Sequence, residues 1–176
     1  KPESGEELWR AEGVHRYVCP SVVTHDDVVY AIGGGSTSLA VRAGGRGDVT
    51  KTHVLWRENK GSNVGSPIYD AGHLYWAEDG GGTMQCQAAD TGAKVYQERF
   101  KPGSGLIWSS PILADGKIYV VSQHEGTFVL AAGPKFEQLS HNKFEDDDSR
   151  TNASPAVADG KIYLRTDKRL YCIGGK

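Results

Sequence analysis

An acidic run at positions 145–148 is the part of the sequence with the most evident capacity for chemistry. It reads Glu-Asp-Asp-Asp, and carboxylate oxygens are the ligands that hard cations such as calcium prefer. A calcium site needs several oxygens that converge on one point, however, and consecutive aspartates cannot all face the same ion. We therefore expect a solvated loop here, with a weak cation site as the alternative.

Other residue types that catalyse reactions or hold metals lack the spacing that their chemistry needs. Cys19, Cys86 and Cys172 are far apart and form no Cys-x-x-Cys pair, which excludes the usual zinc and redox motifs, although one pairing among the three is left open. Cys86 and Cys172 lie in predicted strands, where free cysteine is typically a small buried residue. The six histidines show no metal-binding spacing, and no Gly-x-Ser-x-Gly motif is present. These patterns predict no catalytic residue, no metal site and no cofactor.

The composition argues against two further classes of function. The chain of 176 residues carries 20 basic and 22 acidic side chains, for a formal net charge of −2. Without a basic excess there is no electrostatic basis for nucleic-acid binding. We find no apolar run long enough to span a membrane and no secretion signal at the start of this chain. The length suits a single domain with a real core.

A repeat runs through the whole sequence. Ser-Pro recurs at Pro67, Pro111 and Pro155, and Cys19-Pro20 takes the same place near the start, so that successive prolines are 47, 44 and 44 residues apart. Each proline is followed by a short apolar run, a turn such as Asp-Gly, and a second run rich in β-branched and aromatic residues. Asp-Gly between two such runs favours a hairpin, because glycine accepts the positive φ of the tight turn.

Glycine-rich stretches and two more predicted strands complete each repeat unit. Four short strands in about 44 residues, repeated with matched turns, predict the blades of an all-β propeller. Blades stack around an axis because one small twisted sheet cannot bury both of its faces alone. A β-sandwich is the competing interpretation, but sandwich strands do not share such a period. No segment shows a sustained 3.6-residue apolar period, so helices should be nearly absent.

The ends of the predicted blades resemble the A-x-D-x-x-T-G-K-x-x-W signature of quinoprotein-type (PQQ-like) propellers. Residues 87–96, Gln-Ala-Ala-Asp-Thr-Gly-Ala-Lys-Val-Tyr, are the fullest copy. Residues 2–9 are similar to its second half, and in both copies the aromatic residue, here Trp9, lies four positions after a glycine. Trp56 ends a third copy after an insertion, and Phe136 marks a degenerate fourth.

This resemblance covers the whole chain and implies more than the fold. In the family the aromatic residue docks between adjacent blades, and Thr-Gly forms the turn before the outermost strand. The chain most resembles the quinoprotein-like propeller proteins of planctomycete-type bacteria, which are distantly similar to quinone-dependent alcohol dehydrogenases and to the propeller lipoprotein of the outer-membrane assembly machinery. An extracytoplasmic, periplasmic location follows from that resemblance. The dehydrogenase branch implies a vicinal Cys-Cys, a stacking tryptophan and a Glu/Asn/Asp calcium cluster; this chain has no Cys-Cys and no recognisable cluster, so the quinone is not implied.

The repeat begins in the middle of a blade. Whole blades are expected at about 16–58, 64–101 and 107–145, while residues 151–176 supply three strands and residues 1–10 a closing fourth. Closure by a terminal strand would remove exposed sheet edges. The chain could close alone as a four-bladed ring, or two chains could exchange end strands in an eight-bladed homodimer. Because blades of this type are shaped for seven or eight per ring, we expect half of a larger propeller, either a dimer or part of a longer chain.

The fold also indicates where a binding surface would lie. Loops that join the fourth strand of one blade to the first strand of the next converge on the mouth of the central channel. An aromatic residue, an arginine and amides around this funnel would suit a small polar ligand or a loop of a partner protein. The candidate residues are Tyr17, Asn63, Trp108, Arg150 and Asn152. The alternative is that Trp108 covers the core and the other four are solvated.

The sequence favours a non-catalytic propeller that acts as a protein-interaction or ligand-binding scaffold. The alternative is a part of a quinoprotein-type dehydrogenase whose cofactor residues lie outside this chain. A third hypothesis is sugar binding at the channel mouth.

Overall fold

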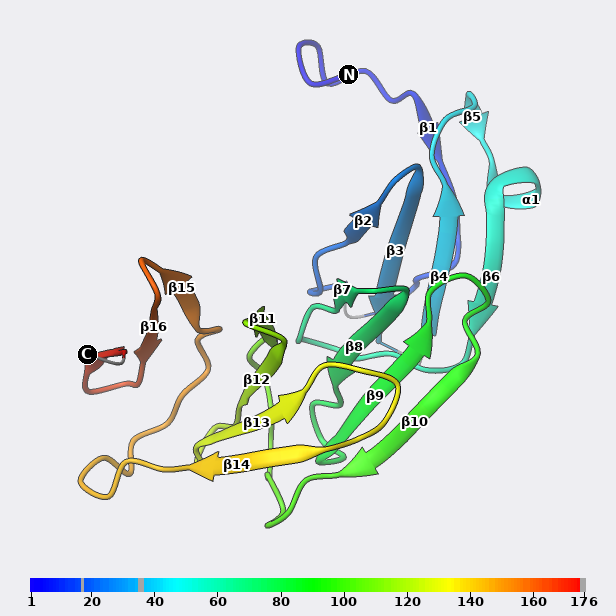
Figure 1. The fold of residues 1–176 in the computed structure, drawn as a ribbon. Helices are drawn as coiled ribbons and strands as arrows, with labels where there is room; N and C mark the ends of the chain where they lie inside the picture. The colour runs from blue at the N-terminus through cyan, green and yellow to red at the C-terminus, as the bar shows by residue number, and fades with distance from the viewer. Residues whose placement is uncertain (17, 35–36, 175–176) are drawn as a thin grey trace.

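The chain folds almost entirely into β-sheet, as the computed structural model in Figure 1 shows for residues 1–16, 18–34 and 37–174. Three four-stranded antiparallel sheets and one three-stranded sheet follow one another along the chain, and each sheet is one blade. The blades are arranged in an open arc, with the first strand of each blade toward its middle. The predicted all-β propeller is therefore confirmed, as a partial ring.

The four blades are numbered in chain order. Blade 1 comprises β2 (Val23–His25), β3 (Val28–Gly33), β4 (Thr37–Arg42) and β6 (Val54–Glu58). Blade 2 comprises β7 (Ile68–Asp70), β8 (His73–Ala77), β9 (Thr83–Ala88) and β10 (Lys94–Arg99). Blade 3 comprises β11 (Ile112–Ala114), β12 (Lys117–Val121), β13 (Thr127–Ala131) and β14 (Gln138–Asn142). Blade 4 comprises β15 (Ala156–Ala158), β16 (Lys161–Arg165) and β17 (Leu170–Ile173).

An insertion between β4 and β6 interrupts blade 1. It contains the short strand β5 (Gly47–Asp48) and α1 (Thr50–His53), the single helix in the described part of the chain. The near absence of helix that the apolar pattern predicted is therefore confirmed.

The turn between the first two strands begins with a residue of positive φ in every blade, and in blades 2 to 4 it has the backbone that the Asp-Gly pattern predicted. Asp26, Ala71, Asp115 and Asp159 adopt φ angles of +49°, +43°, +49° and +51°. In blades 2, 3 and 4 a glycine with positive φ follows directly. Two successive residues of positive φ are typical of a type I′ turn, whose twist matches that of the strands it joins.

The core lies between blades rather than within them. Between blades 1 and 2, a buried cluster joins Tyr30 and Ile32 of β3 to Leu74 and Trp76 of β8. A second cluster fills the space between blades 2 and 3. Its members include Tyr75, Met84, Tyr96, Phe100, Ile118, Phe128 and Leu130. Successive residues of a strand point to opposite faces, so blade 2 buries both faces between its neighbours.

Four equivalent serines join the first strands of the blades. The backbone N–H of Ser21 donates to Ser66 Oγ, that of Ser66 to Ser110 Oγ, and that of Ser110 to Ser154 Oγ, each over 2.9 Å. We call these four residues the serine belt. Each belt serine stands two residues before the first strand of its blade, so the belt defines the phase of the repeat.

The serine belt corrects the expected alignment of the first repeat. Ser21-Val22, and not Cys19-Pro20, takes the place that Ser-Pro takes in the later blades. The belt serines are 45, 44 and 44 residues apart. The shared proline suggested a longer first repeat, but the proline lies in the preceding loop, two residues before the equivalent position.

The docking aromatic residues lie where the family resemblance implied. Trp56 of β6 and Tyr96 of β10 are each only 8% exposed. Trp56 Nε1 donates to the carbonyl oxygen of Ala89 in blade 2 over 2.8 Å, and a Cβ atom on Gly92 would lie 2.6 Å from the indole ring. The outer strand of one blade thus packs its aromatic side chain on the Thr-Gly turn of the next.

Blade 3 has Ser140, not Phe136, at this docking position. Ser140 pairs with Val129 just as Tyr96 pairs with Cys86, but its side chain is exposed. Phe136 lies four residues earlier, where its ring meets that of Tyr96 edge-on with centroids 5.8 Å apart. The expected fourth copy of the motif at Phe136 is therefore wrong, because this ring closes the preceding interface instead.

The first strand of the chain, β1 (Trp9–Arg10), does not join blade 4. It pairs in parallel with β5 at the edge of blade 1, while β17 keeps an edge that no described residue pairs with. The single chain is therefore not the self-closed four-bladed ring. The expected burial of Cys172 is also wrong: no described residue covers the outward face of blade 4, and Cys172 is exposed. Cys86, between blades 2 and 3, is fully buried, which raises the pKa of its thiol to about 12.

Candidate functional site at the channel mouth

The loops at one end of the blades form a continuous layer, which we call the channel mouth. It combines the loops from each fourth strand to the next first strand with the loops between second and third strands. Backbone hydrogen bonds of 2.9–3.1 Å join them in succession, from Ile107 N–H to Asp79, from Gln123 N–H to Leu106, from Thr151 N–H to Gln123, and from Asp167 N–H to Arg150. The main chain itself therefore fixes the shape of the mouth.

Asn63 is held in place by a carboxylate of the next loop. Its backbone N–H donates to Asp79 Oδ1 over 3.2 Å, and its Nδ2 donates to Asp79 Oδ2 over 2.8 Å. The amide is half-buried, so this bidentate contact satisfies both groups within the protein. Asn63 therefore helps to fix the conformation of the loops at the channel mouth.

Arg150 and Asn152 also pair with neighbouring loops. Arg150 is exposed, with Nε 3.5 Å from Asp167 Oδ2. The Oδ1 of Asn152 accepts a hydrogen bond from Gln123 Nε2 over 2.6 Å. The structure thus brings Asn63, Arg150 and Asn152 into one loop layer. Each of the three contacts a polar side chain of a facing loop.

Trp108 is a predicted aromatic residue of the mouth, and like Arg150 it is exposed. It is 41% exposed, and Leu106 beside it is 46% exposed. The alternative that Trp108 simply covers the core does not describe this exposure. Its neighbour Ile107 is fully buried, which anchors the segment while Trp108 and Leu106 face outward. Tyr17, the fifth predicted residue, lies outside the described residues.

The sequence analysis missed the partners of these residues, which also recur with the repeat. Asp79, Gln123 and Asp167 occupy equivalent places in the loops between second and third strands and are 44 residues apart. That spacing equals the spacing of the belt serines in blades 2 to 4, so it could have identified them as one ring of polar residues.

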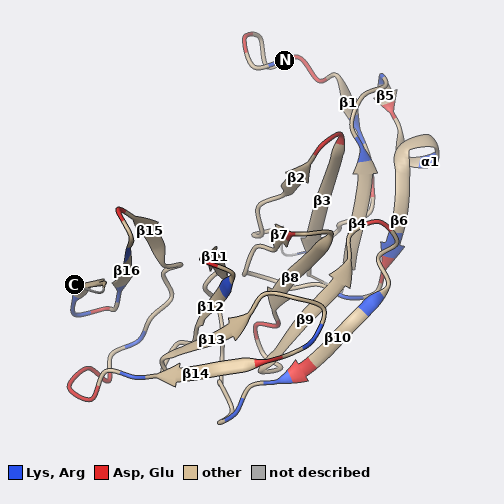
Figure 2. Cartoon of the chain, viewed as in Figure 1, with Lys and Arg blue, Asp and Glu red and all other residues tan. Residues whose placement is uncertain are grey.

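The acidic run 145–148 is exposed at Glu145, Asp146 and Asp148, as expected of a solvated loop, but Asp147 is buried against blade 4. Asp147 is 7% exposed, and its carboxylate accepts hydrogen bonds from Ser149, Tyr171 and Thr166. These hydrogen bonds stabilise the charged form and hold the pKa of Asp147 well below its usual range. Figure 2 shows the run as an acidic loop that follows β14.

The neighbours of Asp147 in this run are ion-paired to the turn between β16 and β17. Asp146 accepts a hydrogen bond from Arg169 Nη1 over 2.8 Å, and Asp148 pairs with Lys168 Nζ over 2.9 Å. The carboxylates thus point to different partners. Because they do not converge on one point, they are not arranged to bind one shared cation. Among the described residues, no cluster of three or more acidic, histidine or cysteine side chains could hold a metal ion.

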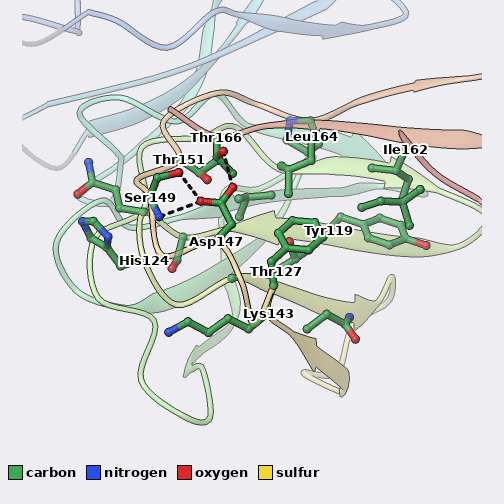
Figure 3. A pocket seen from close by; sticks show the side chains of 18 of the residues that line it. Tyr119, His124, Thr127, Lys143, Asp147, Ser149, Thr151, Ile162, Leu164 and Thr166 are labelled. Atoms are coloured by element: carbon green, nitrogen blue, oxygen red, sulfur yellow. Dashed lines mark hydrogen bonds between the residues drawn. The ribbon is translucent and has the colours of Figure 1, made fainter. Parts of the chain in front are cut away.

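A cleft of about 280 Å³ opens between blades 3 and 4. Tyr119 and Val121 of β12 face Ile162 and Leu164 of β16 across this cleft. At the interface between blades 2 and 3, the residues at the equivalent positions are closely packed. Figure 3 shows Asp147, Ser149 and Thr166 at its polar end. Val129 also lines the cleft and pairs with Ser140 on the neighbouring strand. At the other two interfaces an aromatic side chain stands at the position of Ser140, and the small serine does not fill that space.

The described residues do not fit the quinone that the dehydrogenase branch of the resemblance would require. The three cysteines are all free and lie in separate parts of the ring, so there is no vicinal pair to stack on a cofactor. The mouth carboxylates Asp79 and Asp167 are engaged with Asn63 and Arg150 and do not converge on one point. We therefore derive no step through a quinone or its metal.

The chain is similar in structure to several propellers of known structure. No known protein family matches its sequence, and no curated protein matches it. BamB from Moraxella catarrhalis superimposes with a TM-score of 0.72 and 14% identity, over 94% of this chain and 49% of BamB. The computationally designed Ika4 protein matches with a TM-score of 0.70 and 14% identity, over 97% of this chain and 99% of Ika4.

A dehydrogenase is also among the structures that this chain resembles. Quinohemoprotein alcohol dehydrogenase from Pseudomonas putida HK5 matches with a TM-score of 0.67 and 15% identity, over 89% of this chain and 29% of the enzyme. The chain thus spans about half the length of BamB and less than a third of that enzyme. In the described part of the chain, no helix is long and apolar enough to span a membrane. The chain has the fold of a partial propeller of the quinoprotein (PQQ-like) type.

Proposed function

We propose that this protein is a non-catalytic propeller scaffold that binds a segment of a partner protein at its channel mouth. The observation that carries the proposal is the exposed pair Trp108 and Leu106 in the middle of an otherwise hydrogen-bonded loop layer. A tryptophan held by a rigid main chain loses little entropy on binding, and such residues dominate the energetics of protein interfaces. The exposed guanidinium of Arg150 lies in the same loop layer and offers further donors to a peptide backbone.

We also propose that the working form is a homodimer in which two copies complete one eight-bladed ring. The open arc of four blades supports this assembly, since a partial propeller can complete its ring with another chain. An extracytoplasmic, periplasmic location is proposed on the sequence resemblance given above. No feature of the described residues favours the quinoprotein-dehydrogenase alternative over the scaffold.

A peptide-display selection tests the role of the mouth. Peptides selected on the native chain are expected to bind Trp108→Ala at least tenfold more weakly, since truncating a central interface tryptophan typically costs about 2 kcal/mol or more. The thermal midpoint should be unchanged, because the side chain is not part of the core. Leu55→Ala, which truncates a 41% exposed residue of β6, is the matched control and should bind as the native chain does.

Equal binding to the native chain and to Trp108→Ala would contradict a mouth-centred site. A glycan array probed with the same three proteins separates the sugar hypothesis from the peptide one. Saturable glycan binding that is lost in Trp108→Ala, without any selected peptide, would overturn the choice of a protein partner.

A further inference from the structure

The cleft between blades 3 and 4 is a local opening in an interface that otherwise follows the repeat. Its walls are β12 and β13 of blade 3 and β16 of blade 4, and residues 143–151 line one end. The rings of Phe144 and Tyr171 stack across this interface with centroids 3.7 Å apart. Those of Phe100 and Phe128 pack in the same way between blades 2 and 3, with centroids 4.8 Å apart. The cleft therefore arises from particular side chains and not from a displaced blade.

The first of these side chains is Thr127, which stands where the preceding interface has a methionine. In blade 2, Met84 pairs with Ala77 of the second strand, and in blade 3 Thr127 pairs with the equivalent residue, Val121. Met84 is fully buried in the core between blades 2 and 3, whereas Thr127 lines the cleft. Because threonine is the shorter residue, it leaves space at this position and adds a hydroxyl group to the wall.

The second is Thr151, which stands where the preceding interface has an isoleucine. The N–H of Ile107 donates to the carbonyl oxygen of Asp79, and the N–H of Thr151 donates to that of Gln123 in the equivalent loop. Ile107 belongs to the core between blades 2 and 3, and Thr151 lines the cleft. Both replacements thus exchange a packed apolar side chain for a hydroxyl.

These two hydroxyls have no partner within the part of the chain that the structure describes. Thr151 is only 5% exposed, yet its hydrogen bond is made by the main chain, and no described residue bonds to its Oγ1 or to that of Thr127. Figure 3 shows both threonines among the side chains around the cleft. A polar group that is withdrawn from water without a partner costs free energy. A molecule in the cleft that hydrogen-bonds to them would remove this cost.

The charged groups of the lining are already compensated. Asp147 Oδ1 accepts hydrogen bonds from the N–H and the Oγ of Ser149. Its Oδ2 accepts from the hydroxyls of Thr166 and Tyr171, which completes the four acceptor positions of a carboxylate. Lys143 Nζ is ion-paired with a glutamate over 3.3 Å. Among the described lining residues no carboxylate or ammonium is therefore left for a charged ligand, and the cleft suits a neutral one.

The remaining lining favours an aromatic ring. Tyr119, Val121 and Leu164 give the cleft apolar walls, and its volume is about 280 Å³. An apolar cavity of about 150 Å³ holds a benzene molecule, so a substituted single ring fits. Between blades 2 and 3 the equivalent space holds the phenol ring of Tyr96, whose centroid lies 6.5 Å from that of Tyr75. The repeat itself thus shows which kind of group packs there.

We propose that the cleft between blades 3 and 4 binds a small neutral aromatic molecule with a hydroxyl group, of the phenol class. The ring lies between Tyr119 and Leu164, and the ligand hydroxyl exchanges hydrogen bonds with Thr127 and Thr151. This site is separate from the exposed Trp108 and requires no second copy of the chain. Its test is therefore independent of the peptide selection and of the molar mass.

A titration with 4-methylphenol, which is the tyrosine side chain as a free molecule, tests the site. In the methyl NMR spectrum of the native chain, signals of Val121 and Leu164 should shift saturably. Thr151→Val keeps the shape of the side chain and removes its hydroxyl, so binding should weaken about two- to tenfold, as for the loss of one hydrogen bond. Toluene, which lacks the hydroxyl, should bind to both proteins alike. Thr24→Val, at an exposed position of β2, is the matched control and should bind 4-methylphenol as the native chain does.

A second variant fills the cleft with the side chains of the preceding interface. Thr127→Met combined with Thr151→Ile should abolish the binding of 4-methylphenol and raise the thermal midpoint, because the packing between blades 2 and 3 is restored. Equal binding to the native and filled proteins, or no saturable shift with the native chain, would overturn the proposal. Equal affinity of the native chain and Thr151→Val for 4-methylphenol would overturn the assigned class, since the hydroxyls would then select no ligand.

Discussion

Trp56→Ala is expected to lower the free energy of unfolding by about 3–5 kcal/mol, the usual cost of truncating a buried tryptophan. The indole is 8% exposed and packs against Tyr30 with ring centroids 6.2 Å apart. Its loss would leave a cavity between blades 1 and 2 and would also remove the hydrogen bond from Nε1 to the Ala89 carbonyl oxygen. Chemical denaturation followed by fluorescence of the remaining tryptophans would measure the change.

Leu55→Ala is the matched control for that substitution. Leu55 is the adjacent residue of β6, and its 41% exposed side chain points to the other face of the strand. We expect a change within about 0.5 kcal/mol, as for most surface positions. Similar losses for the two variants would mean that Trp56 does not hold the blades together.

Gly61→Ala is expected to destabilise the protein by about 3 kcal/mol or more, the upper range for forcing atoms into a packed site. Gly61 lies in the loop from blade 1 to blade 2 and passes directly over the backbone of blade 1. A Cβ atom there would collide with the Gly33 carbonyl oxygen and would stand 2.5 Å from that of Thr37. Backbone atoms cannot rotate away as a side chain can, so the loop itself would have to move.

Gly103→Ala is the control for crowding at Gly61. Gly103 lies in the equivalent loop from blade 2 to blade 3, and a Cβ atom there would meet nothing within 4 Å. Thermal unfolding should place this variant close to the native chain and Gly61→Ala far below it. If both variants unfold with the native protein, the loop at Gly61 is not tightly packed on the backbone of blade 1.

The repeat made most of the fold predictable from sequence. Asp-Gly turns, proline-led strands and a period of 44 residues each have a local physical cause, so four antiparallel blades followed from them. The docking of Trp56 also followed, because the Thr-Gly turn and the aromatic residue belong to one motif. Elements of this kind depend on residues close together in the chain.

The errors concern contacts between distant segments. Cys19-Pro20 suggested a phase that the hydrogen bond of Ser21 to the next blade corrects by two residues. Asp147 belongs to an acidic run, but tertiary contacts with Thr166 and Tyr171 bury it. Cys172 is exposed because no described blade packs on its face of β17, and no local pattern in β17 could reveal this.

The candidate mouth was only partly predictable, for the same reason. The fold indicated which loops meet there, but not that Asn63 and Arg150 would be engaged by facing carboxylates. Their partners lie in loops of the neighbouring blade and are distant in sequence. What distinguishes Trp108 is its exposure, and exposure depends on the packing of Ile107 beneath it.

In the proposed assembly, this arc of four blades is half of a ring that a second copy completes. The molar mass of the 176-residue chain in solution, measured by light scattering, tests it most directly. The account predicts a mass near 38 kDa, twice the 19.0 kDa of one chain. A stable particle of 19 kDa would contradict it.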